Sequence, residues 1–241
     1  VILALYLFFK NRYNQKMYAK KLINNKLELI QQNLNPHFIF NSLNLIYSSI
    51  LEDKKEEALQ TVRDFSSLHR SFLERSKEKQ VSIASELRFI ESYLAIESMR
   101  FKDNIAINHI ITIDPNCDTN TIFIPPNILQ PLIENAIKYG QSGGKVEVCV
   151  DHSIINTIGV HEVELSVRDY GPGIAAEFLP RLTERFYRID VAVSRDKGGT
   201  GLGLAIVKHI VNRHRGRFAV ESQLGAGAVF RVFLPQYSNY F

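Results

Sequence analysis

Two glycine-rich segments in the second half of the chain hold the residues best suited to chemistry. In the first, RDYGPGI, a strand-like run ends at Asp169, and Gly171 and Gly173 follow it. Glycine lets a backbone approach a flat ligand where any Cβ would clash, and a carboxylate in that place can accept the exocyclic amine of adenine. Alone, this motif is a weak indication, because turns after strands often have the same composition.

The second segment, KGGTGLGLAIVKHI, leads from a glycine loop directly into an amphipathic helix. Unpaired N–H groups and the positive end of such a helix are suited to binding phosphates. The segment is not a Walker loop, because no GK[ST] follows, and it is not the dinucleotide fingerprint, because Leu204 takes the place of the third glycine. A flexible glycine hinge is the alternative interpretation. The loop residues in question are Gly199, Thr200, Gly201, Leu202 and Gly203.

A third segment, PLIENAIKYG, lies upstream of both and is predicted to be helical. It places Asn135 and Lys138 on one helix face, with Tyr139 beside them. The amide oxygen of asparagine is a suitable ligand for Mg²⁺, and lysine is a point charge for phosphate. Without the two glycine-rich segments, a solvated helix surface would be the better interpretation.

Together and in this order, the three segments resemble the N box, G1 box and G2 box of the histidine-kinase branch of the GHKL ATP-binding superfamily. RFYRID, residues 185–190, is similar to the F box of that family, which is part of the lid over the nucleotide. The resemblance covers nearly all of residues 102–241 and implies an ATP site with Mg²⁺ bound at Asn135. The nucleotide contacts that it implies are Asn135, Lys138, Tyr139, Asp169, Gly171, Gly173, Arg188, Gly199, Thr200, Gly201, Leu202 and Gly203.

A kinase of this branch needs a histidine that accepts the phosphoryl group, and the first half of the chain offers His37. It follows Pro36 in QQNLNPHFIFNSLN, where the proline interrupts a helical rhythm of apolar residues. NPHFIFN resembles the acceptor motif of autolysin-sensor (LytS-like) kinases, and VSIASELRFIESYLAIESMRF resembles the segment before their ATPase domain. This resemblance implies that His37 is the phosphoacceptor. Because proline donates no backbone hydrogen bond, we expect the break to expose His37. Without the family match, a core histidine would be the better interpretation.

A second histidine in the helical half is a poorer candidate. His69 lacks the acid and the proline of the orthodox H-E-x-x-P acceptor motif. It also falls between Phe65 and Phe72, which favours a packed or interface histidine.

The residue that would orient His37 is harder to identify. Phe38 stands where orthodox kinases have an acid, so Glu134, beside Asn135, is the candidate for an assisting catalytic carboxylate. Pro131 stands where the water-activating GHKL ATPases have a glutamate. That difference favours transfer to a protein group over simple hydrolysis of ATP.

The two halves of the chain resemble different branches. Residues from about 20 to 140 are similar to the LytS-like group. Residues 163–241 are instead similar to orthodox kinases of the phosphate-regulon sensor type, which have a longer lid. We hypothesise a hybrid chain whose join lies between Gly140 and Val163. Nucleotide binding then requires that the two parts of the sheet still pair.

The apolar pattern predicts helices over the first hundred residues. Residues 13–51 form one long helix or two in series, since the apolar residues from Ile23 to Leu34 follow the spacing of a coiled coil. The charged run EDKKEE separates this stretch from a second helix, and a third is expected near residues 85–101. Two antiparallel helices of this kind bury their apolar stripes best by pairing with a second copy, as a four-helix bundle.

After Phe101, strands and helices alternate. Predicted strands cover residues 105–113, 145–150, 161–170, 217–222 and 228–235, the last two as a hairpin. Predicted helices cover residues 125–140 and 203–214, and Gly216 is the expected cap of the second. The expected fold class is α+β. Residues 11–80 form the helical hairpin of a dimeric bundle, residues 81–101 a connecting helix, and residues 102–241 a two-layer α/β sandwich of the GHKL type.

The start of the chain, VILALYLFF, is apolar but shorter than the roughly 20 residues that cross a bilayer. We expect residues 1–10 to be the end of a transmembrane helix, with the following basic residues on the cytoplasmic side of a bacterial membrane. An apolar end of a soluble protein is the alternative. The net charge of +4 is mild and spread out, which argues against direct binding of nucleic acid.

The resemblance thus implies the cytoplasmic part of a dimeric sensor histidine kinase. It would autophosphorylate on His37 with ATP and then transfer the phosphoryl group to an aspartate in the receiver domain of a response regulator. One alternative is an ATP-binding module without kinase activity, in which the helices only dimerise. Another is a serine kinase of the anti-sigma type, against which the apolar start and the long N-terminal helices argue.

Overall fold

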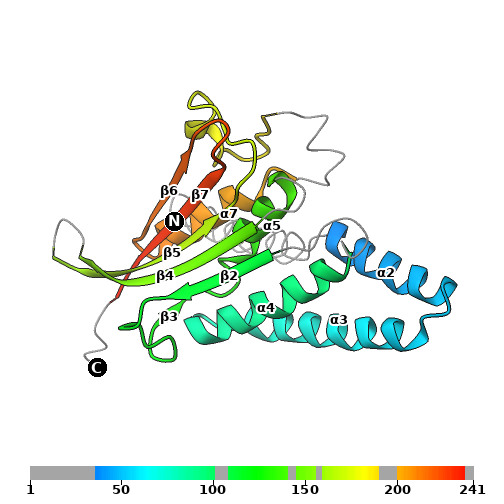
Figure 1. The fold of residues 1–241 in the computed structure, drawn as a ribbon. Coiled ribbons are helices and arrows are strands. Elements are labelled where there is room, and N and C mark those ends of the chain that lie inside the picture. The colour runs from blue at the N-terminus through cyan, green and yellow to red at the C-terminus, as the bar shows by residue number, and fades with distance from the viewer. Residues whose placement is uncertain (1–35, 101–107, 141–144, 156–158, 190–199, 237–241) are drawn as a thin grey trace, which may run out of the picture. The chain divides into compact units, whose positions relative to one another are not determined.

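A computed structural model describes residues 36–100, 108–140, 145–155, 159–189 and 200–236 of the chain (Figure 1). The chain forms two compact units, residues 1–43 and 44–241. The predicted transmembrane end, residues 1–10, and the coiled-coil stretch before Pro36 lie outside the described residues. Within the part of the chain that the structure describes, no helix is long and apolar enough to cross a membrane.

Two helices follow one another, as the charged run between them predicts. α2 spans Pro36–Leu51 and α3 spans Lys55–Arg75. Between them, Asp53 has a φ of 58°, and a left-handed residue cannot continue a right-handed helix. A third helix, α4, spans Ile83–Arg100 and begins two residues before its predicted start.

Helix α3 has both a buried and an exposed apolar side. On the buried side Phe72 packs against Phe89 of α4, with ring centroids 6.2 Å apart. The exposed side leaves an apolar stripe without cover in this unit, which is what a bundle of two copies requires. The exposed apolar residues of α2 and α3 in this unit are Tyr47, Ile50, Leu51, Leu59, Val62 and Leu73.

The rest of the second unit is built on a five-stranded sheet with the strand order β2-β4-β5-β7-β6. The strands are β2 (Asn108–Ile113), β4 (Lys145–Ile155), β5 (His161–Arg168), β6 (Arg217–Ser222) and β7 (Ala228–Pro235). β2 and β4 are parallel, and the other neighbours are antiparallel. A parallel pair requires a crossover connection, and α5 (Gln130–Tyr139) lies in that connection.

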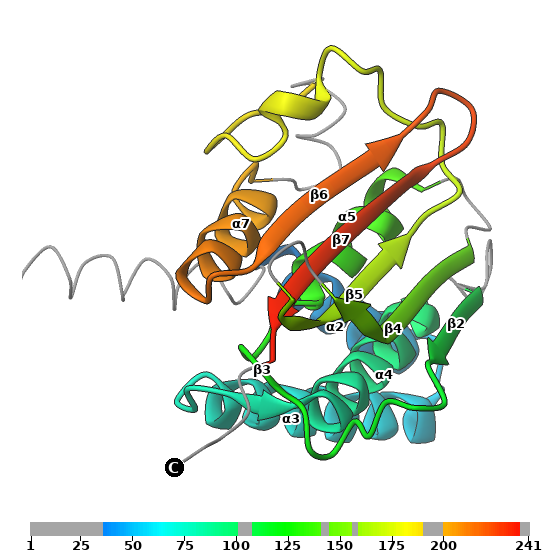
Figure 2. The same cartoon turned by 90° about the vertical axis from the view of Figure 1, so that its left-hand side faces the viewer.

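One face of the sheet is covered by α5 and by α7 (Gly203–Arg213), as Figures 1 and 2 show. β4 and β7 bury every second residue, the period of a strand with one covered face, whereas the central strand β5 also buries Glu162 and Ser166. The buried strand residues are Val146, Val148, Val150, Val163, Leu165, Val167, Phe230, Val232 and Leu234. Leu132 and Ile133 of α5 and Val207 and Val211 of α7 are buried as well. The predicted two-layer α/β sandwich is confirmed.

The predicted helix over residues 125–140 is wrong at its start, because α5 begins only at Gln130. Asn127 has a φ of 58°, which a right-handed helix excludes. Just before it, β3 (Phe123–Ile124) pairs antiparallel with β1 (Val81–Ser82). The sequence does not predict this pair, since two residues are too few to show a period.

The end of α7 also differs from the prediction. The helix ends at Arg213, and the left-handed residue after it is Arg215, with a φ of 58°, instead of Gly216. Gly216 donates its N–H to the carbonyl of Val211 (2.9 Å). A Cβ on Gly216 would lie 2.2 Å from the carbonyl oxygen of Phe233. Glycine is therefore required here by the neighbouring strand β7 and not by the helix cap.

The hypothesised join falls where the sheet is continuous. β4 and β5 pair antiparallel, with one register shift between Asp151 and Ile154. β5 in turn pairs with β7 over residues 162–168. Nucleotide binding by a hybrid chain requires that the sheet strands on the two sides of the join pair, and these strands do pair. The hybrid origin itself stays a prediction.

Candidate active site

Helix α5 carries the residues that the sequence assigns to a metal and to phosphate. Nδ2 of Asn135 donates to the carbonyl of Pro131 (2.8 Å). This hydrogen bond uses the donor group of the amide and leaves Oδ1, a hard oxygen, as the atom for a cation. Lys138 lies about one turn further along α5 and supplies a positive charge.

Glu134 has contacts along its own helix. Its Oε1 accepts a hydrogen bond from Nε2 of Gln130 (3.1 Å), and its Oε2 lies 3.8 Å from Nζ of Lys138. The side chains of Lys138 and Glu134 are only 15% and 16% exposed. Glu134 therefore holds the lysine charge close to α5 before any phosphate binds. Tyr139, the last residue of α5, is exposed.

Asp169 is buried just after β5 and is held by two backbone donors. Its Oδ1 accepts the N–H groups of Gly171 (2.9 Å) and Ala228 (3.2 Å). Among the described residues no donor bonds to Oδ2, which leaves this oxygen as the acceptor for a ligand amine. Burial raises the pKa of Asp169, and the two N–H groups and the charge of Arg168 lower it in part.

Both glycine-rich segments lie against α5. A Cβ on Gly171 would lie 2.6 Å from the carbonyl oxygen of Tyr139. A Cβ on Gly203 would lie 3.4 Å from Cβ of Pro131 and 4.0 Å from Nδ2 of Asn135. The three segments that the sequence identifies separately therefore meet around one helix.

Contacts with the protein's own backbone require glycine at several of these positions. Gly173 has a φ of 73°, and its Cβ would lie 2.0 Å from the carbonyl oxygen of Gln223 in the turn between β6 and β7. Gly201 has a φ of 70°, and its Cβ would lie 2.9 Å from Cα of Phe186. The N–H of Phe186 also donates to the carbonyl of Gly201 (2.9 Å). At these positions and at Gly171, the close approach is that of protein backbone.

The remaining predicted nucleotide contacts lie before and at the start of α7. The carbonyl of Leu202 accepts the N–H of Ile206 (2.9 Å), so the helix forms from this point. The first N–H groups of a helix have no partner within it, and they are available to phosphates. Thr200 is exposed, Arg188 is half-buried, and Gly199 lies outside the described residues.

The sequence does not identify the turn that supports Asp169. Gly227 has a φ of 77°, and its Cβ would lie 2.1 Å from the carbonyl oxygen of Asp169. The N–H of Asp169 donates to the carbonyl of Ala228 (2.9 Å). The only indication in the sequence was the run GAGA, whose two glycines could be assigned to a hairpin but not to a partner.

The two histidines considered as acceptors have different settings. His37 is the second residue of α2, directly after Pro36, which opens the helix. Proline suits the first position of a helix, because the N–H that it lacks would have no partner there. The ring of His69 stacks on that of Phe65, with centroids 6.0 Å apart and planes at 24°. The prediction of a packed histidine at position 69 agrees with this contact.

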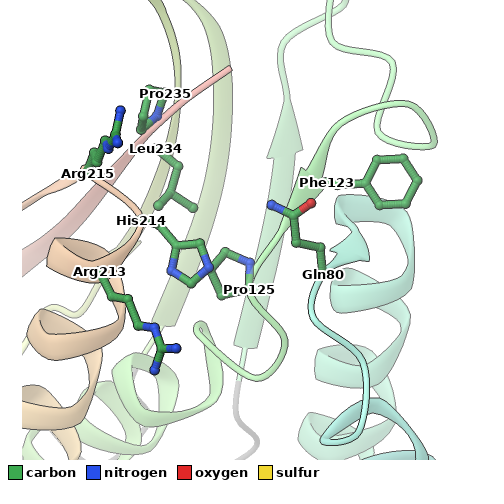
Figure 3. Close-up of a pocket in the computed structure, with 8 residues that line it drawn as sticks. All are labelled: Gln80, Phe123, Pro125, Arg213, His214, Arg215, Leu234 and Pro235. Atoms are coloured by element: carbon green, nitrogen blue, oxygen red, sulfur yellow. The ribbon is translucent and has the colours of Figure 1, made fainter. Parts of the chain in front are cut away.

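A cavity of about 230 Å³ lies apart from these residues. Figure 3 shows Gln80, Phe123 and Pro125 at one side of it and Arg213 and His214, at the end of α7, at the other. None of the predicted nucleotide contacts lines this cavity. The candidate site is therefore the region around α5, the end of β5 and the start of α7.

The residues in that region fit ATP with Mg²⁺. Mg²⁺ in such sites keeps several waters and takes few oxygens from the protein besides those of phosphates, so Oδ1 of Asn135 is a sufficient protein ligand. Within the described residues, His, Cys, Asp and Glu side chains form no group of three or more that could hold a metal. Oδ2 of Asp169 is an oxygen suited to accept an amine, and the N–H groups at the start of α7 are donors of the kind that bind phosphates.

Two family models match the chain. The model described as "Histidine kinase-, DNA gyrase B-, and HSP90-like ATPase" matches residues 126–238, and the model described as "Histidine kinase" matches residues 25–105. The first range contains α5, both glycine-rich segments and the sheet from β4 to β7. The second contains His37 and the helices up to α4.

Curated relatives of both predicted branches are similar to the chain. The sensor protein LytS of Staphylococcus haemolyticus (strain JCSC1435) is 34% identical over 168 residues, which are 68% of this chain and 27% of that protein. The sensor histidine kinase YpdA of Escherichia coli (strain K12) is 33% identical over 217 residues, 88% of this chain and 34% of that protein. The phosphate regulon sensor protein PhoR of Pseudomonas aeruginosa is 46% identical over 99 residues, 41% of this chain and 21% of that protein.

The chain thus spans between about a fifth and a third of the length of these relatives. Among solved structures, the mycobacterial sensor histidine kinase MprB is 25% identical with a TM-score of 0.48. The similarity covers 65% of this chain and 95% of the MprB chain.

Proposed function

The chain belongs to the histidine kinases, and from this premise we propose that it is the kinase part of a two-component sensor. In this proposal it phosphorylates His37 with ATP and Mg²⁺. It then transfers the phosphoryl group to an aspartate in the receiver domain of a response regulator.

The observation that carries the proposal is the meeting of three sequence segments at α5. Gly171 approaches the carbonyl of Tyr139, and Gly203 approaches the amide of Asn135. One helix thereby has a buried carboxylate beside its last turn and the start of α7 beside Asn135. These three groups fit the three parts of Mg²⁺–ATP: the carboxylate fits the base, Asn135 fits the cation, and the start of α7 fits the phosphates.

Each group has a distinct role in this proposal. Asn135 would hold the cation through Oδ1, and Asp169 would accept the adenine amine through Oδ2. Lys138, kept near α5 by Glu134 at 3.8 Å, would balance the phosphate charge. The bound Mg²⁺–ATP supplies the γ-phosphoryl group. Phosphoryl transfer otherwise needs mainly positioning and charge stabilisation, which these side chains and the start of α7 provide.

His37 would be the nucleophile, because a neutral imidazole is well populated near pH 7 and has a free ring nitrogen. Glu134 is the proposed assisting carboxylate, and its hydrogen bond from Gln130 fixes the orientation of its carboxyl group. Pro131 occupies the place one turn before Asn135 and has no group to activate water. This favours transfer to a protein side chain over hydrolysis.

The helices suggest how the chain assembles. We propose a homodimer in which α2 and α3 pair with a second copy, supported by the apolar residues that these helices leave exposed. We also propose that this region of the protein lies on the cytoplasmic side of a bacterial membrane. Direct binding of nucleic acid forms no part of the proposal.

Labelling with γ-labelled ATP tests the acceptor. The unmodified protein, incubated with Mg²⁺, should acquire label that is labile in acid and stable in alkali, the property of a phosphoramidate. His37→Gln should abolish labelling, and the matched control His69→Gln should keep it. Asn135→Ala should abolish labelling through loss of the cation ligand.

Label that persists in His37→Gln would contradict the assignment of the acceptor. Nucleotide binding without any label would favour the alternative function, an ATP-binding module that only dimerises. Titration with a fluorescent ATP analogue in the same samples shows whether a protein that takes up no label still binds the nucleotide.

A further inference from the structure

A fully buried carboxylate from α4 holds the backbone that leads into α5. Glu86 is 0% exposed. Its Oε1 accepts the N–H of Leu129 and its Oε2 accepts the N–H of Asn127, each at 3.0 Å. Leu129 directly precedes α5, and its own side chain provides no cap. Glu86 therefore satisfies backbone donors at the start of α5 and places negative charge where the helix dipole favours it.

Glu86 is paired with Arg75, the last residue of α3. Nη2 of Arg75 donates to Oε2 of Glu86, and Nη1 donates to the carbonyl (2.6 Å) and the hydroxyl (2.8 Å) of Ser85. The guanidinium carbon lies 5.0 Å from the ring centroid of Phe89. Burial raises the pKa of Glu86 and lowers that of Arg75, and the charge of each partner offsets part of this effect. Each charge is thus buried only because the other is present.

A further hydrogen bond connects the same elements. Nδ2 of Asn127 donates to Oγ of Ser76, the residue after α3 (3.2 Å). Asn127 keeps a φ of 58°, a left-handed conformation that residues with a Cβ rarely adopt and that its hydrogen bonds to Glu86 and Ser76 help to hold. We call the three buried residues Arg75, Glu86 and Asn127 the buried polar node. The node joins the end of α3, the first turn of α4 and the start of α5.

Stability alone does not account for such a node. A buried ion pair costs desolvation, and apolar residues of similar size often stabilise a fold equally well or better. What the pair provides is a defined geometry. Asn135 lies six residues after Leu129, or about 9 Å along an α-helix. Because a short helix moves as a rigid body, a shift at Leu129 also displaces Asn135 and Lys138.

We propose that Glu86 is a positioning residue for α5 and that Arg75 couples it to α3, the second helix of the hairpin that bears the acceptor histidine. This inference rests on the proposed function. The node fixes the positions from which Asn135 and Lys138 hold the cation and the phosphates of ATP. Loosening it slows phosphoryl transfer, which depends on alignment, more than it weakens ATP binding, to which Asp169 also contributes.

Four variants test this inference. Glu86→Gln and Arg75→Met remove one partner each. Glu91→Gln on α4 and Arg70→Met on α3 repeat the same changes at exposed positions of the same helices. The thermal midpoint of each protein is measured first. At a temperature well below the lowest midpoint, we then measure the single-turnover rate of labelling, the ATP dissociation constant and the hydrogen exchange of α5.

We expect the two node variants to lose about tenfold in labelling rate while ATP affinity changes by less than about twofold. Exchange in α5 should become faster in both, including Arg75→Met, whose substitution lies on another helix. The two controls should behave as the unmodified protein does. If a single variant does not fold, the double variant Arg75→Met with Glu86→Gln, which buries no unpaired charge, is measured instead.

Equal losses of labelling rate and ATP affinity would overturn the inference, because they indicate general damage to the domain. Exchange in α5 that is unchanged in Arg75→Met would also overturn it. If the unmodified protein takes up no label, the proposed kinase function has failed, and α5 exchange decides the inference alone. Faster exchange in both node variants but in neither control supports it, and unchanged exchange overturns it.

Discussion

At Asp169 the candidate contact to adenine depends on one carboxylate oxygen, since the N–H groups of Gly171 and Ala228 use the other. Burial raises the pKa of this group, so it takes up a proton at a higher pH than an ordinary aspartate, which titrates near about 3.9. Because Oδ1 accepts two N–H groups, the proton goes to Oδ2 and turns this oxygen from an acceptor into a donor. We therefore expect ATP affinity to fall on acidification, beginning above the ordinary range of aspartate, in binding titrations between about pH 7.5 and about pH 5.

Asp169→Asn is the control for this pH dependence. The amide keeps the shape of the side chain but presents a donor to the adenine amine, so ATP affinity should fall by about tenfold to a hundredfold, the worth of a hydrogen bond to a charged group. Its remaining affinity should not vary with pH in the acidic range. A variant that still follows the curve of the unmodified protein would assign the titration to another group. Because the folded-state pKa is raised, the ionised group opposes folding, and acidification adds stability to the ATP-free protein.

Some residues can be assigned a candidate role from their type and sequence neighbours, whereas the role of others is explained only by the contacts that they make in the fold. Asn135 and Asp169 are candidates from the sequence because one has a hard amide oxygen on a predicted helix and the other has a carboxylate directly before a glycine-rich turn. At Gly173 the structure adds a reason for glycine that the sequence does not show, since its Cβ would meet the carbonyl of Gln223. No local pattern reveals a contact between residues fifty positions apart, so the sequence predicts the glycine but not its partner.

At the scale of elements, the hairpin of β6 and β7 supports the candidate site, because Gly225 donates its N–H to the carbonyl of Pro172 (2.7 Å) and Gly227 packs against Asp169. Gly225 and Gly227 have φ values of 81° and 77°, but a Cβ meets nothing within 4 Å at Gly225 and lies 2.1 Å from the carbonyl oxygen of Asp169 at Gly227. Gly225→Ala should therefore cost only the backbone conformation, about 1 kcal/mol. Gly227→Ala should cost at least about 2 kcal/mol more, because β7 must move away from Asp169.

Denaturant unfolding of both variants measures these costs, and ATP titration measures their effect on the site. Gly227→Ala should weaken ATP binding because the displaced Ala228 no longer donates to Asp169, whereas Gly225→Ala should leave it unchanged. Equal destabilisation of the two variants would show that backbone conformation, and not the contact with Asp169, makes glycine necessary at position 227.

A helix or strand can be predicted from the sequence where its own residues determine its type and its ends. The period of apolar residues is sufficient to find α5, since Leu132, Ile133 and Ala136 recur at helical spacing and are buried. Its start is not predictable, because the left-handed backbone of Asn127 is held by Glu86, a residue of another helix. The buried polar node is invisible to sequence analysis for the same reason. A glutamate in an amphipathic helix gives no sign that its carboxylate is buried.

For the whole molecule, the layered α/β architecture follows from the alternation of strand and helix patterns. The pairing order of the strands does not, because β2 pairs with β4 and β5 pairs with β7, and the strands of each pair are distant in sequence. The continuous pairing of β4, β5 and β7 means that the two branch-like parts share one sheet. We therefore expect an uninterrupted core, whatever the origin of the chain.

In the proposed homodimer, the two copies meet through the apolar residues that α2 and α3 leave exposed. Val62, on α3, is 42% exposed, and Val62→Glu should raise the dissociation constant of the dimer at least about tenfold, because a buried, unpaired charge is costly. Sedimentation equilibrium measures this, with Gln60→Glu as a control that adds the same charge at an exposed polar position. ATP affinity should stay unchanged, since no candidate nucleotide contact lies on α3. A Val62→Glu protein that dimerises as tightly as the control would place the dimer interface elsewhere.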